Sequence, residues 1–415
     1  MSISDGKRWV TLENIIVQKY GGTSLQNTER IKNTAKRIKS YREKGREMVV
    51  VVSAMGKTTN NLLDLARTIS DSPPKRELDV LLSTGEQISI ALLSIALNEI
   101  GIDTLSLTGA QCGIKTNGLH SNARIEDIDD ARILQELKRG RVVIVAGFQG
   151  INEKGDITTL GRGGSDTTAV ALAAALKAEK CEIYTDVDGV YSTDPRIVPK
   201  AVKLNAIRYD EMLEMARLGA QILHPRSVEL AKNHQVPLEV RSSLNFNSGT
   251  IILGEITMED IRISGITSEK NIARISIARV PDKPGIAYRL FKCLSENEIS
   301  IDMILQNLNH ENANDISFTT PTEALGEALP IVEKFAGEIE AQEIIVKENV
   351  CKISLVGTGI LGHGEVAAAF FETLSNLGIN IEMISTSETK ISCLIDGKDA
   401  DNAVRTLHRI FFEQN

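Results

Sequence analysis

The segment GRGGSD, residues 161–166, places one cation and one anion at a glycine-rich turn, directly before an alanine-rich stretch. Glycine lets the backbone come close to a ligand, and Arg162 can bind a carboxylate through two parallel N–H groups. Ser165 can cap the following helix, which we expect to run to about Lys180, and Asp166 needs a partner near buried glycines. A capped surface turn with a solvated arginine and aspartate is the alternative.

A second glycine turn occurs in QKYGGTS, residues 18–24, at the end of an apolar stretch. Lys19 lies close to Gly21 and Gly22, so a point charge and free backbone N–H groups can both face a phosphate. The GxxxxGK[ST] spacing of a Walker A loop is absent. A solvated lysine beside a tight turn remains the alternative.

The segment YTDVDGVYSTDPR, residues 184–196, gathers acidic side chains around a glycine after an apolar strand. It differs from a calcium loop because no bidentate glutamate occupies the twelfth position. A loop that faces ATP fits better, with Arg196 toward phosphate and Tyr191 near the nucleoside.

Glu86 is unusual because it lies in a long apolar segment that we expect to form a central helix, residues 76–100. A carboxylate in such a helix needs a partner or a ligand. Helix capping or a structural hydrogen bond at a break near Gly85 is the alternative.

The elements that must position these side chains alternate as far as about residue 250. Short runs rich in valine and isoleucine alternate with helical patterns, expected at about 26–44, 58–69 and 76–100. Strands that are apolar on both faces are typical of a parallel sheet covered by helices on each side. We therefore predict a three-layer α/β/α sandwich.

The remainder of the chain repeats itself. Residues 274–304 align with 352–384, and each copy reads as a strand, a glycine-containing turn, a helix and a second strand. Small sheet modules of this kind leave an edge or a face unsatisfied, which pairing with each other or with another chain would remove. The pattern predicts a regulatory pair of modules and an oligomer.

The second copy also contains a GxGxxG pattern, formed by Gly357, Gly359 and Gly362, with Glu382 about twenty residues later. A dinucleotide site is one interpretation. We favour a glycine-rich turn, because too little chain follows for a doubly wound sheet and the first copy lacks the pattern.

Composition argues against nucleic-acid-binding, disulfide-rich and membrane proteins. The net charge of −8 over 415 residues argues against a nucleic-acid partner. The five cysteines lack CxxC spacing, so we expect reduced thiols and neither zinc nor disulfides. No membrane-spanning run or signal peptide is expected, so the interpretation is a soluble cytoplasmic protein.

Taken together, QKYGGTS, TLGRGGSDTTA, YTDVDGVYSTDPR and the paired C-terminal modules resemble the aspartate kinases of the amino-acid kinase family. The resemblance covers essentially the whole chain. It implies transfer of a phosphoryl group from Mg-ATP to the β-carboxylate of L-aspartate, which opens the synthesis of lysine, threonine and methionine. A catalytically silent amino-acid sensor, or a kinase acting on glutamate, carbamate or a nucleotide, remains an alternative.

The resemblance also implies a domain layout. It places a catalytic α/β/α domain at 1–250, of which the first 14 residues are an extension without expected function. Two ferredoxin-like ACT domains follow at 251–341 and 342–415, with the first inserted in the second.

Site residues follow by matching position. The resemblance implies that ATP is bound by Lys19, Tyr20, Gly21, Gly22, Thr185, Asp186, Tyr191, Ser192, Thr193, Asp194, Pro195 and Arg196. It implies that aspartate is bound by Thr59, Glu86, Arg162 and Ser165, with Arg162 on a carboxylate and Glu86 on the ammonium group. Lys19 and Asp166 are the expected catalytic residues: Lys19 neutralises charge and Asp166 orients the site. Gln221 replaces a lysine that often helps to hold the nucleotide.

Regulation by end products is also implied by the resemblance. Lysine, threonine or both are the expected effectors, in a homo-oligomer, a dimer or tetramer, assembled through the ACT domains. The segments DKPGIA and SIDMILQN nominate Asp282, Ala287, Asp302 and Gln306 as effector contacts.

Overall fold

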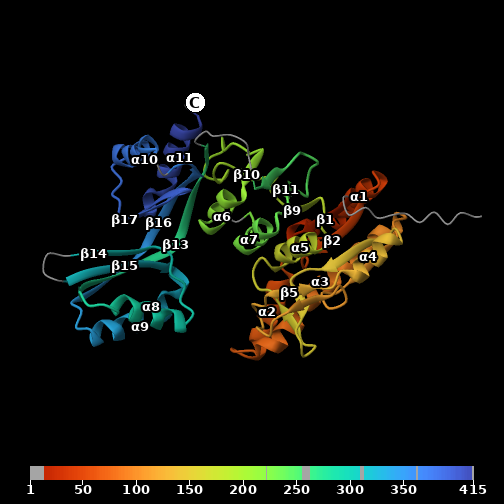
Figure 1. Cartoon of the computed structure of the whole chain (residues 1–415), viewed down its shortest axis with the longest axis horizontal. Coiled ribbons are helices and arrows are strands. Elements are labelled where there is room, and N and C mark those ends of the chain that lie inside the picture. Colours follow the sequence, from red (N-terminus) through yellow and green to blue (C-terminus); the bar gives the residue numbers. More distant parts are fainter. Residues whose placement is uncertain (1–13, 221, 255–261, 309–312, 361–362, 414–415) are drawn as a thin grey trace, which may run out of the picture. The chain divides into compact units, whose positions relative to one another are not determined.

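The computed structural model describes residues 14–220, 222–254, 262–308, 313–360 and 363–413. The chain divides into two compact units (Figure 1). The first unit comprises the described residues of Met1–Val190, Lys203–Arg217 and Gln221–Met258. The second unit comprises those of Tyr191–Val202, Leu218–Ala220 and Glu259–Asn415.

An eight-stranded sheet forms the centre of the first unit, in the order β10-β12-β11-β9-β1-β2-β6-β3. Every neighbouring pair is parallel except β11 and β12. The strands are β1 (Ile15–Tyr20), β2 (Glu47–Val52), β3 (Thr104–Leu107), β6 (Val142–Ala146), β9 (Lys180–Thr185), β10 (Ala206–Arg208), β11 (Leu238–Ser242) and β12 (Thr250–Leu253). Strands β2 and β6 are buried along their whole length, as expected for a sheet covered on both faces.

Helices cover this sheet on both faces, which confirms the predicted α/β/α sandwich. They are α1 (Thr28–Glu43), α2 (Thr58–Ile69), α3 (Lys75–Glu99), α4 (Ala131–Lys138), α5 (Gly164–Ala175), α6 (Tyr209–Arg217) and α7 (Pro225–His234). Ile31 and Ile38 of α1 pack with Leu93 and Leu97 of α3 against one face. Helix α5 contacts β1, β2 and β9 and also packs on α7. Helix α5 ends earlier than the sequence suggested.

A smaller sheet in the first unit has no counterpart in the predictions. Its order is β5-β4-β7-β8, and its strands are β4 (Ile114–Thr116), β5 (Ile125–Ile128), β7 (Gln149–Ile151) and β8 (Ile157–Thr159). These strands have three or four residues each, too short for alternation of apolar and polar residues to be visible in the sequence.

We expected no segment long and apolar enough to span a membrane, but helix α3 meets both criteria. It is the one helix of the described chain with sufficient length and hydropathy, and 44% of its most apolar window is buried. The same helix carries two buried carboxylates, Asp79 and Glu86, which are expensive inside a bilayer. Its buried leucines pack in the core of the first unit.

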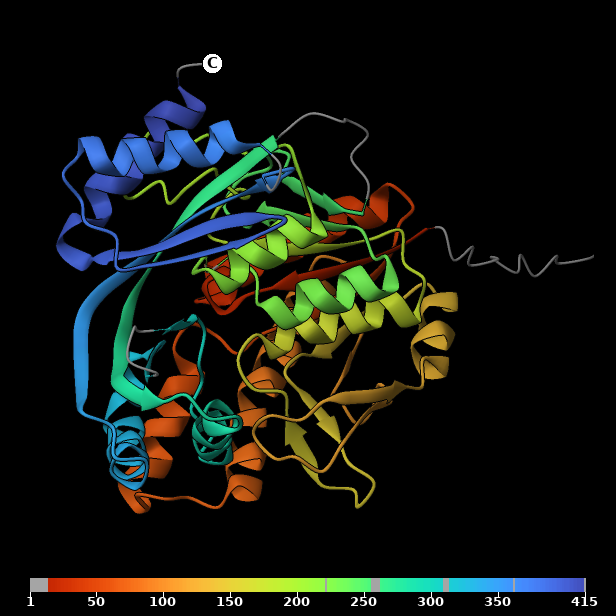
Figure 2. The same cartoon turned by 60° about the vertical axis from the view of Figure 1, so that its left-hand side comes forward.

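The second unit contains a six-stranded antiparallel sheet in the order β14-β15-β13-β16-β18-β17. Its two central strands, β13 (Arg262–Pro281) and β16 (Glu343–Thr358), run side by side over almost their whole length (Figure 2). The remaining elements are β14 (Ile304–Leu308), β15 (Ala313–Pro321), β17 (Met383–Ser387), β18 (Lys390–Asp396), α8 (Ile286–Glu296), α9 (Leu325–Glu338), α10 (Gly364–Asn376) and α11 (Ala400–Phe412).

Two large helix-covered cores lie along the two long strands, beside a smaller cluster of buried residues that includes Ile272 and Val350. Ile275 of β13 packs with α8 and α9, whereas Ile266 of the same strand packs with Ile353, α10 and α11. Each core therefore belongs to one copy of the sequence repeat, and β13 and β16 contribute half of their length to each. The boundaries drawn at residues 250/251 and 341/342 stay predictions.

The GxGxxG pattern does not form a dinucleotide site. Gly357 lies in β16, Gly359 has a positive φ of 75°, and Gly362 lies outside the described residues. The strand before the pattern pairs antiparallel with both of its neighbours, whereas a dinucleotide fold requires parallel strands. Glu382 forms an ion pair with Arg274 at 3.0 Å.

We predict that Leu93→Ala lowers the free energy of unfolding of the first unit by about 2–5 kcal/mol, because it opens a cavity beside α3. Ile95→Ala is the matched control on the same helix, since Ile95 is 65% exposed and Leu93 is fully buried. The control should change this free energy by less than about 0.5 kcal/mol. Urea unfolding followed by circular dichroism measures both, and equal effects would contradict the orientation of α3.

Candidate functional site

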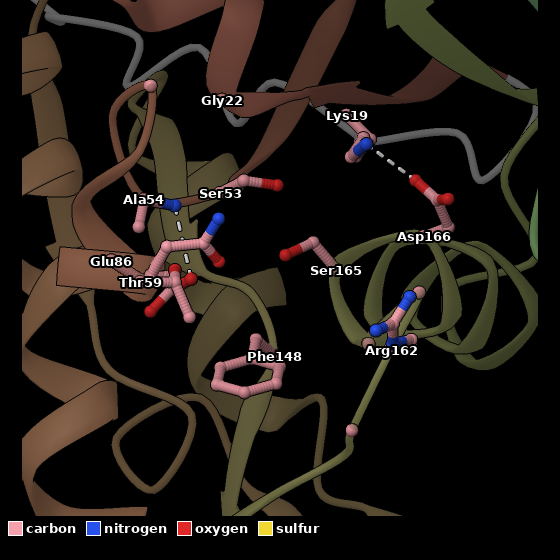
Figure 3. A pocket seen from close by; sticks show the side chains of 15 residues that line it. Lys19, Gly22, Ser53, Ala54, Thr59, Glu86, Phe148, Arg162, Ser165 and Asp166 are labelled. Atoms are coloured by element: carbon pink, nitrogen blue, oxygen red, sulfur yellow. Dashed lines mark hydrogen bonds and ion pairs between the residues drawn. The ribbon is translucent and has the colours of Figure 1, made fainter. Parts of the chain in front are cut away.

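A cavity of about 350 Å³ lies near the carboxyl ends of β1 and β2, the usual place for ligands in an open parallel sheet. Its lining brings together seven residues predicted from the sequence: Lys19, Gly22, Thr59, Glu86, Arg162, Ser165 and Asp166. In Figure 3, Glu86 and Thr59 lie on one side, Lys19 and Asp166 lie on the other, and Ser165 lies between them. The size is typical of a small-molecule site.

Lys19 and Asp166 form an ion pair of 2.6 Å at one side of the cavity. Lys19 comes from the last residues of β1, and Asp166 comes from the first turn of α5, where the helix dipole favours an anion. A side chain at Gly22 would come within 2.7 Å of the backbone oxygen of Ala54. Only glycine therefore lets this turn approach the neighbouring loop, which explains the second residue of the Gly-Gly pair.

Glu86 lies at the other side of the cavity and is only partly satisfied. A side chain at Gly85 would approach the Cβ atom of Ala54 to 2.8 Å, so Gly85 allows α3 to pack tightly there without a helix break. The backbone N–H of Ala54 donates to Glu86 Oε1 at 3.1 Å. Glu86 Oε2 is buried and has no hydrogen-bond partner among the described residues. Burial raises the pKa of Glu86 to about 7.

Arg162 stands between two glycines with positive φ, Gly161 at 75° and Gly163 at 69°. Its side chain is exposed and lines the cavity. Within the described ranges, its guanidinium forms no hydrogen bond or ion pair. The fork is therefore available to an anionic ligand.

Tyr20 lies in the core of the first unit. Its ring is fully buried and stacks on Tyr184, with ring centroids 4.6 Å apart. Its hydroxyl group donates to Gln18 Oε1 at 3.0 Å, and burial raises its pKa. Alternation along β1 therefore turns the Tyr20 side chain into the core, and the role of Tyr20 in ATP binding stays a prediction.

The predicted nucleotide loop is divided between the units. Thr185 and Asp186, at the end of β9, belong to the first unit, and their side chains hydrogen-bond to each other at 3.0 Å. Residues 191–196 belong to the second unit. There the Arg196 guanidinium binds the Asp194 carboxylate at 2.7 Å. The roles of Tyr191, Thr193 and Pro195 stay predictions.

Ser192 lies inside the second unit. It is fully buried, accepts a hydrogen bond from the backbone N–H of Val202 at 2.8 Å and lies 3.0 Å from His408 Nε2. The Ser192 hydroxyl group is therefore engaged in packing within the second unit, and its role in ATP binding stays a prediction. Ser192 and Thr193 are adjacent hydroxyl residues in this motif, and the sequence does not show which of them is buried.

Sequence reasoning missed five residues that line the cavity: Ser53, Ala54, Gly56, Asn60 and Phe148. Ser53 and Ala54 directly follow β2, and Phe148 lies two residues after β6. Phe148 has a positive φ of 70°, which is rare for an aromatic residue. For Ser53, Ala54 and Phe148 the available signal was their place after buried parallel strands, since these strand ends meet at one edge.

The described residues contain no group of three or more metal-ligating side chains. Asp166, the carboxylate next to Lys19, is already engaged in an ion pair.

None of the four residues nominated for effector binding is among those that line the cavity of this module, and their roles stay predictions. Asp282 accepts a hydrogen bond from Asn314 at 3.0 Å, and Asp302 pairs with the buried Lys352. Gln306 is exposed, whereas Ala287 packs against the core formed by α8 and α9. A cavity of about 520 Å³ in the same module is lined by other residues, which include Lys283, Tyr288, Arg289 and Glu338. Gln221 lies outside the described residues.

Comparison with known proteins identifies both parts of the chain. Residues 14–242 match the model of the amino acid kinase family, and residues 275–334 and 353–411 match an ACT domain model. An aspartate kinase of Pseudomonas putida is 51% identical over 399 residues, covering 96% of this chain and 97% of the relative. Aspartokinase 2 of Bacillus subtilis is 50% identical over 398 residues, with the same coverage of both chains.

Solved structures give the same result. E. coli aspartokinase III in complex with aspartate and ADP matches with a TM-score of 0.81 and 26% identity, covering 96% of this chain and all of that one. The same enzyme with lysine and aspartate matches with a TM-score of 0.75 and 25% identity over the same share of this chain. The fold and cavity define a small-molecule kinase joined to ACT domains. The chain belongs to the aspartate kinases of the amino acid kinase family.

Proposed function

We propose that this chain transfers the γ-phosphoryl group of Mg-ATP to the β-carboxylate of L-aspartate, giving 4-phospho-L-aspartate. The observation that carries the proposal is a single cavity lined by Lys19 and Gly22 at one side, by the buried, unpartnered Oε2 atom of Glu86 and by the exposed guanidinium of Arg162. The buried oxygen of Glu86 suits an ammonium group, and the fork of Arg162 suits a carboxylate. An amino acid with an acidic side chain supplies both.

The chemistry requires positioning and charge neutralisation more than proton transfer. The attacking carboxylate has a reference pKa of about 3.9, so it is ionised near neutral pH and needs no general base. Lys19 is placed to neutralise charge on the transferring phosphoryl group, and Asp166 orients the Lys19 ammonium group through their ion pair. Magnesium would be held mainly by phosphate oxygens and water, and it supplies further charge neutralisation.

Regulation through the ACT modules is the second part of the proposal. The E. coli relative has been solved with lysine, which supports lysine as an effector here, and threonine alone or with lysine is the further candidate. The sheet of the second unit ends in β14 and β17, which have one strand neighbour each among the described strands. Pairing of such edges between chains supports a homo-oligomer, and we place this soluble enzyme in the cytoplasm. The sensor alternative is disfavoured because Lys19, Arg162 and Glu86 are all present.

An ATP-dependent hydroxamate assay tests the activity and its substrate. We expect product with aspartate and none with glutamate or acetate, and we expect lysine, threonine or the pair to reduce the rate. If product formed with glutamate and not with aspartate, the substrate would be glutamate and the proposal would be wrong. No product with any carboxylate, from folded protein that still binds lysine, would favour the sensor.

We predict that Lys19→Ala lowers kcat by at least about a hundredfold, because it removes fixed charge from the transferring group. Arg162→Ala should instead raise the KM for aspartate by more than about tenfold, since it removes a charged two-point contact. Lys36→Ala, an exposed lysine on α1, is the control and should change neither value. Initial rates over a grid of both substrates separate the effects, and an unchanged aspartate KM in Arg162→Ala would refute its role.

A pH dependence follows from Glu86. Its carboxyl group has a pKa raised to about 7, so it becomes protonated and neutral as the pH falls through that value. Only the ionised form attracts the ammonium group, so the KM for aspartate should rise about tenfold between pH 8 and pH 6. In Glu86→Gln the KM should be higher at pH 8 and nearly independent of pH. A wild-type KM that stays flat over this range would rule out the ammonium contact.

A further inference from the structure

The turn that carries Arg162 is packed against the beginning of α7. Helices α5 and α7 lie side by side in the first unit (Figures 1 and 2). A Cβ atom added at Gly163 would lie only 2.2 Å from the Cβ atom of His224, the residue that caps α7. No side chain can therefore stand at Gly163 unless α7 moves, and the turn and the cap are in direct contact.

Arg226, in the first turn of α7, binds this region through two hydrogen bonds. Its Nη1 atom donates to the backbone oxygen of Leu160 at 2.9 Å, and its Nη2 atom donates to that of Ala123 at 2.8 Å. Leu160 directly precedes the glycine turn. One guanidinium group thus joins the base of this turn to a second loop.

The place of Arg226 is electrostatically unfavourable for a cation. The first turn of a helix carries the positive end of the dipole, and burial lowers the pKa of the Arg226 side chain. The group is held there by two carbonyl oxygens, without a carboxylate partner among the described residues. The backbone N–H of Arg226 also donates to His224 Nδ1 at 3.3 Å, which fixes the cap against Gly163.

The loop that contains Ala123, which accepts a hydrogen bond from Arg226, also contacts the glycine turn. A Cβ atom at Gly161 would meet the backbone oxygen of Ser121 at 3.1 Å, and the backbone N–H of Ala123 donates to the Thr159 oxygen at 2.9 Å. The turn is consequently enclosed on both sides. Only Arg162 projects from it without a protein partner in the described ranges.

We infer that Arg226 is a positioning residue for aspartate binding: it ties the backbone directly before the glycine turn to the neighbouring loop at Ala123 and so fixes the direction of the Arg162 guanidinium. The inference rests on the proposed function. Arg226 is not among the residues that line the cavity, so it touches neither substrate and acts through Arg162. Loss of these Arg226 contacts should therefore weaken aspartate binding, in which Arg162 takes part. It should leave ATP binding at Lys19 unchanged.

The experiment is steady-state kinetics of Arg226→Gln and Arg226→Lys with aspartate and ATP varied independently. We expect Arg226→Gln to raise the aspartate KM about tenfold, because small misplacements of a binding group have large effects, with the ATP KM and kcat changed less than about threefold. Arg226→Lys keeps the charge but reaches one carbonyl, so it should fall between wild type and Arg226→Gln.

Arg42→Gln is the matched control. Arg42 also bridges backbone oxygens, those of Arg46 at 2.6 Å and Gly140 at 2.9 Å, but at the amino ends of the strands, away from the cavity. It should lower the melting temperature without changing the aspartate KM. If Arg226→Gln raises both KM values equally, or only lowers the melting temperature, the positioning role is overturned. Should Arg226→Gln fail to fold, the same criteria apply to Arg226→Lys.

A double-mutant cycle isolates the mechanism. If Arg226 acts through Arg162, the aspartate KM of Arg162→Ala/Arg226→Gln should equal that of Arg162→Ala within about twofold. Multiplicative effects would overturn the inference while the proposed function stands. Absence of aspartate phosphorylation by the wild-type enzyme would instead refute the proposed function.

Discussion

The half-satisfied carboxylate of Glu86 is the constraint on which the cavity depends. Burial of an anion is unfavourable unless hydrogen bonds or opposite charge compensate it. The protein supplies one backbone donor, from Ala54, and leaves the second oxygen of Glu86 without a partner among the described residues. The close approach of α3 that makes this possible needs a glycine at position 85, because any larger residue would press on Ala54. Packing and ligand recognition are thus decided by two adjacent residues.

The other charges of the site follow a complementary principle. Lys19 is already paired with Asp166, whereas Arg162 has no protein partner in the described chain. A paired cation keeps a fixed position, which suits a group that must meet charge developing during a reaction. An unpaired cation on a rigid turn suits a group that must capture a free anion. The two cations are therefore supported by different means: an ion pair for one, backbone geometry for the other.

Much of the first unit could be predicted because its signals are local. Buried strands such as β2 and glycine turns next to charged residues are visible in the sequence, and they led to Lys19, Glu86 and Arg162. The orientation of Tyr20 and the burial of Ser192 could not be predicted in the same way, because each depends on partners distant in the chain, Tyr184 and His408. The short strands of the second sheet lack enough residues to show a period. Arg226 had no signal at all, since its contacts are backbone oxygens.

The repeat in the C-terminal part shows a different limit. Sequence alignment located two copies, and the resemblance implied that the first is inserted in the second, but the alignment alone did not show that β13 and β16 run through both cores. Residues near 262–269 serve the copy that begins some eighty residues later. Order along the chain and membership of a core are therefore separate properties here.

This sharing of strands has a consequence for how the regulatory part can change. A module that owned all its strands could be deleted or exchanged by recombination as an independent piece. Here, deletion of either copy would remove a strand that pairs with β13 or β16. The strand that remains would expose its backbone N–H and C=O groups to other chains. We therefore expect the two modules to be inherited, expressed and unfolded together. A conformational change in one module also displaces β13 and β16, and these strands belong to the core of the other module as well.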